Sequence, residues 1–243
     1  SEIKFVTVEE IKSRSMKMIS KCAKAVIRIC NKRNLRMANI AGDDEFDPLK
    51  NTSKEKCKID CNPTAADEHM EEVEQMIRVV KERIRASCSR MPWKKAIPKM
   101  TVRETVKNAV VMLNAFPPKS GINAHLSPRN IVTGKTLNHN IHFKLPFGDY
   151  AQVHQNEEPQ NSNKEQTLGA ISLGPLDNAQ GGWKFMSLAT GHFTKRHSWD
   201  AMPMTQEVTD KVIQFGEAEN SPEGTIIRNN DGDVDHNDFK HDD

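Results

Sequence analysis

The element that the sequence encodes most clearly is the stretch EVEQMIRVVKERIR (residues 72–85). Apolar residues recur through it at intervals of three and four, which is the spacing of one face of an α-helix. We therefore expect a helix over residues 67–89 that turns an apolar stripe toward a core. The stripe consists of Val73, Met76, Ile77, Val80, Ile84 and Cys88.

A second edge of the same helix is charged. At 100° per residue, four side chains fall together on it: Glu74, Arg78, Lys81 and Arg85. One carboxylate near the N-terminal end is thus followed by three cations. Two interpretations are open, namely a binding edge for an anionic ligand and ordinary support of the helix by a Glu74–Arg78 pair one turn apart.

The sequence before this helix predicts alternating strands and helices. Residues 3–11 (IKFVTVEEI) are β-branched and aromatic and predict a strand. Residues 15–33 have an apolar stripe of helical period with lysines outside it, and residues 35–42 predict a short buried strand. Residues 57–61 predict one further strand.

After the long helix, a second helix is expected at residues 101–115, and Pro117 and Pro118 then break the chain. Beyond them the pattern is typical of short strands. The segment Ala189–Gly191 predicts a hairpin turn between the last two of these strands. The strands are expected at residues 150–154, 169–173, 183–188 and 192–199.

The net charge of +2 conceals three segregated blocks. Residues 12–36 hold nine basic residues and no acidic one, and residues 78–107 hold ten basic residues against two acidic ones. Residues 217–243 hold nine acidic residues against two basic ones, so we expect this tail to be disordered. Basic blocks in a folded region favour a polyanionic partner, whereas the simpler alternative is a solvated helix face.

The chain has no apolar run near the roughly 20 residues that span a bilayer, so no membrane partner is expected. Five cysteines, an odd number without a secretory signal, favour reduced thiols. Cys57 and Cys61 are spaced like half a zinc site, but no second pair follows, so core packing is the better interpretation.

Four motifs in this order resemble the integrase region of copia-type retrotransposon polyproteins. GDDEFDPL (residues 42–49) resembles the segment of the second catalytic Asp, and residues 72–85 resemble the helix of the catalytic Glu. Residues 106–135, with Leu-Asn, Pro and Thr-Gly-Lys, look like the connection after the catalytic core. Residues 169–199 resemble the small β domain that follows it.

The resemblance implies an α/β fold made of four parts. A truncated RNase H-like integrase core is expected at residues 1–116, followed by a linker with a short helix at 117–148. A small antiparallel, barrel-like β domain is expected at 149–215, and an acidic disordered tail at 216–243.

The resemblance also assigns site residues. Asp43 corresponds to the second catalytic carboxylate and Glu74 to the third, and both would bind Mg²⁺. Arg78, Lys81 and Arg85 would bind the DNA backbone. The first catalytic Asp of the family, like its N-terminal zinc module, would lie upstream of Ser1. Since the complete enzyme uses two magnesium ions, we expect at most one weakly bound ion here and no activity by the chain alone.

The implied function is that of a retrotransposon integrase fragment, in the family of polynucleotidyl transferases that integrate DNA. Its partners would be the element ends and the target DNA. The complete enzyme would be a homo-oligomer that acts in the nucleus, after a cytoplasmic particle stage of the parent polyprotein. Two alternatives remain: a catalytically dead, degenerate fragment that only binds nucleic acid, and a protein-interaction module built on the β domain.

Overall fold

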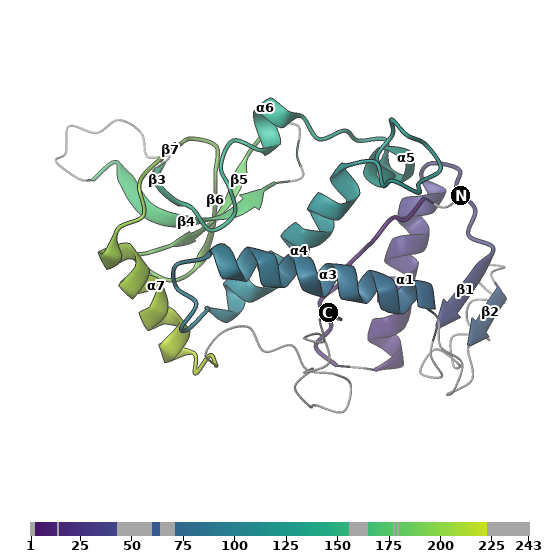
Figure 1. Ribbon diagram of the computed structural model, residues 1–243, viewed down its shortest axis with the longest axis horizontal. Coiled ribbons are helices and arrows are strands. Elements are labelled where there is room, and N and C mark those ends of the chain that lie inside the picture. Colours follow the sequence, from purple (N-terminus) through teal and green to yellow (C-terminus); the bar gives the residue numbers. More distant parts are fainter. Residues whose placement is uncertain are drawn as a thin grey trace, which may run out of the picture. The chain divides into compact units, whose positions relative to one another are not determined.

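The computed structural model describes residues 3–13, 15–42, 60–63, 71–155, 165–176, 178 and 180–222, and the chain is a mixed α/β protein (Figure 1). It divides into two compact units. The first comprises residues 1–79 and 110–136, and the second residues 80–109 and 137–243. The division falls within two helices, so it does not coincide with the domain boundary expected after residue 116. That boundary remains a prediction, because compact units need not be separately folding domains.

In the first unit, two described helices pack against each other. α1 spans Met16–Asn31 and packs against the short α5, Pro128–Thr133. The hydroxyl of Ser127 caps α5 by accepting a hydrogen bond from the Asn130 amide, and Gly134 ends it at a φ of 70°. The helix predicted at residues 15–33 is therefore confirmed, and α5 is a short helix inside the predicted linker.

The strand predicted at residues 3–11 is wrong. Residues 3–13 are irregular in the structure. Val6 finds its backbone partners in a side chain: its N–H donates to Asn114 Oδ1 at 2.9 Å, and its carbonyl accepts from Asn114 Nδ2 at 2.6 Å. The carboxamide of Asn114 thus makes the two hydrogen bonds that a peptide group of a neighbouring strand would make. Residues 3–11 are accordingly not part of a sheet in the described structure.

Two short strands form a parallel pair in the same unit. β1 spans Asn39–Gly42 and β2 spans Asp60–Pro63, with Asn39 opposite Asp60. They fall within or next to the strands predicted at residues 35–42 and 57–61, which were placed a few residues too early.

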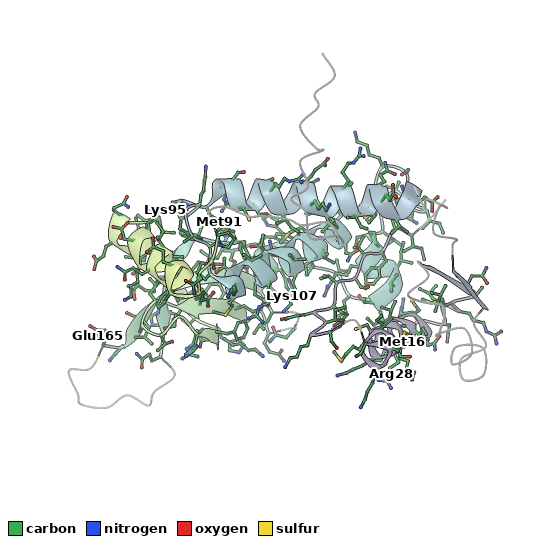
Figure 2. The ribbon with its side chains drawn as sticks, turned by 90° about the horizontal axis from the view of Figure 1, so that it is seen from below. Met16, Arg28, Met91, Lys95, Lys107 and Glu165 are labelled. Atoms are coloured by element: carbon green, nitrogen blue, oxygen red, sulfur yellow. The ribbon has the colours of Figure 1, made fainter. Side chains whose placement is uncertain are left out.

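Two long helices pass from one unit into the other. α3 spans Glu71–Arg90, and α4 spans Lys99–Ala115. Both were predicted within a few residues. The turn that joins them holds Trp93, which is fully buried, and Figure 2 labels Met91 and Lys95 on either side of it.

The second unit is built on a five-stranded antiparallel sheet in the order β6-β5-β4-β3-β7. Its strands are β3, Tyr150–His154; β4, Thr167–Pro175; β5, Trp183–Ser187; β6, Phe193–Arg196; and β7, Trp199–Ala201. The first three match predictions. The single strand predicted at residues 192–199 is wrong, because the chain turns at His197 and continues at the opposite edge of the sheet.

That crossing requires a curled sheet. A flat sheet of five strands is roughly 19 Å wide between its edge strands. The step from Arg196 to Trp199 spans at most about 11 Å. The two edges therefore approach each other at this corner, although β6 and β7 are not paired and the sheet is open.

Apolar side chains cover both faces of the sheet. On one face Ile171, Leu173 and Met186 pack with the described helices of this unit. On the other face Val153 and Phe185 lie among a second cluster, where Trp199 stacks at a tilt 5.1 Å from Trp183. Along these strands Val153, Ile171, Leu173 and Phe185 are buried, and Leu188 is partly buried.

Two further helices complete the second unit. α6 is one turn, His139–His142, and α7 spans Gln206–Ala218. Thr205 caps the N-terminus of α7: its hydroxyl accepts a hydrogen bond from the Val208 backbone amide. The helix buries Val212. The expected disordered tail from residue 216 is therefore wrong at its start, since residues 216–218 are helical. Residues 223–243 lie outside the described residues.

Candidate nucleic-acid interface

One edge of α3 gathers the charged residues that the sequence singled out. Glu74 and Arg78 are exposed, and Lys81 and Arg85 are half-buried. By helical geometry the four side chains share an arc of about 60°. Glu74, Lys81 and Arg85 each interact with other groups of the protein. This edge can therefore present three cations in line, with one carboxylate at the end nearer the helix N-terminus.

The other expected catalytic residue, Asp43, lies outside the described residues. The structure does place β1 directly before it, because that strand ends at Gly42. Thus the sequence position of Asp43 follows a strand, and that of Glu74 lies on a helix. The distance between the two carboxylates stays a prediction.

The fit to magnesium rests on few described groups. Mg²⁺ prefers oxygen ligands, and Glu74 supplies one exposed carboxylate. Within the described ranges, no three His, Cys, Asp or Glu side chains come together as a metal site.

The apolar stripe of α3 changes character along the helix. Ile84 and Cys88 are buried, as predicted, but Val73 is 46% exposed and Ile77 is 49% exposed. The prediction that the whole stripe faces a core is wrong for its first two turns. The reason is packing: the described core cluster that receives Ile84 lies entirely in the second unit, whereas Val73 and Ile77 belong to the first.

A buried carboxylate that sequence analysis did not single out is Glu104 on α4. It accepts from Lys107 at 2.7 Å and from Lys184 on β5 at 2.8 Å. Burial by itself would raise the pKa of Glu104, but the hydrogen bonds and charges of the two lysines offset this, so its pKa is lowered. Because both carboxylate oxygens are occupied, this cluster fastens a helix to the sheet and is a structural feature.

A groove in the second unit is unsuited to a polyanion. It runs between α7 and the beginning of β4, and carboxylates from Glu165, Glu207 and Asp210 line it against Lys211. With more negative than positive charge, it would repel phosphate groups. The helical edges are the better candidates for nucleic acid.

Comparison with known proteins finds no family model that matches the chain. It likewise finds no curated protein with a significant match. Among the described helices, none is long and apolar enough to cross a bilayer.

Proposed function

We propose that this chain is a DNA-binding fragment of a retrotransposon integrase, similar to the copia type. The observation that carries the proposal is the edge of α3, where Glu74 is followed along one 60° arc by Arg78, Lys81 and Arg85. A carboxylate with trailing cations suits a phosphodiester: the carboxylate would hold a metal ion at the reacting phosphate, and the cations would follow the neighbouring backbone.

The order of elements supports the same proposal. A strand ends one residue before Asp43, a parallel partner follows, and α3 then carries Glu74. This order agrees with an RNase H-like core. A curled antiparallel sheet comes next, in agreement with a barrel-like small domain. Both fold assignments are part of the proposal.

In the proposed enzyme family, the chemistry is the in-line attack of a hydroxyl or water oxygen on a DNA phosphodiester. Bound Mg²⁺ ions would stabilise the attacking and leaving oxygens. Asp43 and Glu74 would hold the metal. Arg78, Lys81 and Arg85 would position the DNA by contacts that are independent of sequence. The complete enzyme would be a homo-oligomer that acts in the nucleus.

We further propose that the chain alone does not join DNA ends. Two magnesium ions carry four positive charges, and Asp43 with Glu74 offsets only two of them. If Asp43 and Glu74 are the only carboxylates that hold metal, one reacting oxygen would be left unassisted, and the loss of one such preorganised contact would cost about 3–4 kcal/mol of transition-state stabilisation. A single weakly bound ion is the most that these two groups support.

A DNA-binding assay tests the interface. The triple substitution Arg78→Ala, Lys81→Ala and Arg85→Ala should weaken binding to all duplex sequences alike and flatten its salt dependence. Arg83→Ala is the matched control, since Arg83 is an exposed cation on the opposite side of the same helix. Equal binding by the triple variant and the control would refute the interface.

An oligonucleotide joining assay with magnesium or manganese tests the catalytic part. We expect no joined product from the chain or from Glu74→Gln. Joining by the chain that Glu74→Gln abolishes would overturn the proposed inactivity and identify an active enzyme. Joining that survives Glu74→Gln would remove Glu74 from the site.

A further inference from the structure

The most concentrated positive charge in the described structure lies on α1. Four cations of this helix and one at its C-cap fall within an arc of about 80° by helical geometry: Lys17, Lys21, Lys24, Arg28 and Lys32. All are exposed except Lys24, which is half-buried. Figure 2 views α1 nearly along its axis and labels Arg28. These five residues form the α1 stripe.

The α1 stripe differs from the edge of α3 in its charge balance. α1 contains no acidic residue, whereas α3 contains four acidic residues among five basic ones. Within the described part of the chain, the five cations of the stripe form no ion pair. Among the described residues, no carboxylate is thus paired with this charge, and counterions around unpaired cations are the ions that a polyanion releases on binding.

The spacing of the stripe also suits a long, regular anion. The cations recur about once per turn over roughly 22 Å from Lys17 to Lys32. Double-stranded DNA carries about one charge per 1.7 Å of its axis, and each contact to it contributes more to the salt dependence than a contact to a single strand. A straight row of cations therefore gains most from a duplex.

A lipid surface is a poorer match. A helix that binds membranes must place its apolar face among the lipid chains. On α1 that face is already covered: Ile27 is buried, Ile19 and Val26 are half-buried, and the helix packs against α5. Among the described residues of α1, the exposed ones are Lys17, Lys21, Arg28 and Asn31.

We propose that the α1 stripe binds the phosphate backbone of double-stranded DNA, as a surface separate from the edge of α3. The proposal goes beyond the integrase assignment and does not depend on Glu74 or Asp43. It places the strongest electrostatic contact in the first unit and gives the α3 edge the smaller share of affinity.

The test measures the affinity of the full chain for a duplex oligonucleotide over a range of salt concentrations. The variant carries Lys17→Gln, Lys21→Gln, Lys24→Gln and Arg28→Gln. Because Gln is a good helix former, α1 should keep its helical circular dichroism. The slope of log K against log salt is negative. If each cation contacts one phosphate, the magnitude of this slope falls by roughly 3.6 in the variant, and affinity at low salt falls at least about tenfold.

A charge-matched control carries four Gln substitutions at exposed lysines of the second unit: Lys94, Lys95, Lys99 and Lys144. It loses the same net charge, so we expect a slope change of less than about 1 from the general field. Equal slopes in the two variants would show that the α1 stripe is only a solvated face, and would overturn the proposal.

Four further measurements test the proposal. If the four-site variant does not fold, the pair Lys17→Gln and Lys21→Gln should lower the slope by roughly 1.8, and an unchanged slope would refute the stripe. Tighter binding to single-stranded DNA or RNA than to duplex, or binding to anionic vesicles that the variant abolishes, would also overturn it. A slope change in the α3 triple variant alone would uphold the proposed function while refuting this inference.

Discussion

The two units of the molecule bury apolar side chains to very different degrees. Of the 21 buried hydrophobic residues among those described, 18 lie in the second unit. Of the nine large hydrophobic residues that are exposed, seven lie in the first: Val8, Ile11, Val73, Ile77, Phe116, Ile122 and Leu126. The second unit has a sheet with an apolar cluster on each face, and the first has only a short parallel pair in its described part.

The contrast shows where the stability of the described structure resides. Hydrophobic stabilisation is proportional to the apolar area removed from water, at about 25 cal/mol per Å². Side chains such as Trp93, Trp183 and Phe185 contribute fully, because they are buried completely. We therefore expect substitutions in the second unit to have the largest effects on the free energy of unfolding. Substitutions in the first unit should have smaller effects, because more of its large apolar side chains are exposed.

The largest expected difference between the units is in the free energy of unfolding, when one isoleucine in each unit is replaced by alanine. Ile171→Ala on β4 removes a fully buried side chain and should lower the free energy of unfolding by about 2–5 kcal/mol. Ile77→Ala on α3 removes a side chain that is 49% exposed and should cost under about 1 kcal/mol, since Ala is also the better helix former. Denaturant unfolding measures both values. Equal losses would show that Ile77 is packed in solution.

The next effect tests the contact of α7 with the turn after α3. A Cβ at Gly216 would overlap the carbonyl group of Ala96, 2.6 Å from its carbon. Ala normally stabilises a helix relative to Gly. Here we expect Gly216→Ala to destabilise the protein by about 1–3 kcal/mol, because a backbone group cannot yield easily. The neighbouring exposed Glu217→Ala is the control and should be neutral. A stabilised Gly216→Ala variant would place α7 elsewhere.

Prediction from the sequence succeeded for elements that local signals specify and failed where contacts between distant residues determine the structure. Helices α3 and α4 and strands β3, β4 and β5 were predictable, because periodicity and turn residues are local signals. The irregular path of residues 3–13 was not, since the carboxamide that binds Val6 comes from Asn114, 108 residues away. The exposure of Val73 depends on what packs against α3, and periodicity is silent on that. For the proposed site, helical periodicity predicted which charged residues share one edge of α3. The approach of Asp43 to Glu74 stays a prediction.

A smaller effect concerns pH and Glu104. Its pKa is lowered in the folded protein, so its contribution to stability is fully present above the pKa of the unfolded chain and is lost as the pH falls through the folded value. Glu104→Gln should cost about 1–2 kcal/mol at pH 7, and this cost should shrink as the pH falls through the lowered pKa of Glu104, because protonation then removes the same charge. Unfolding measured from pH 7 to pH 3 checks this, with exposed Glu207→Gln as the control.

The smallest effect belongs to the first unit and concerns Asn114, which holds Val6 by two hydrogen bonds. Asn114→Ala removes both partners, but neighbouring residues 7–13 are exposed, so water can replace them, and the local cost should be about 1 kcal/mol. Hydrogen exchange at the Val6 amide should then speed up about fivefold, while the amides of β4 keep their rates. Asn114→Asp keeps the acceptor for the Val6 N–H, so its Val6 amide should exchange more slowly than in the Ala variant. The contrary outcome is that residues 3–11 join a sheet. Alternate amides of this segment would then be protected from hydrogen exchange, and Asn114→Ala would leave their exchange rates unchanged.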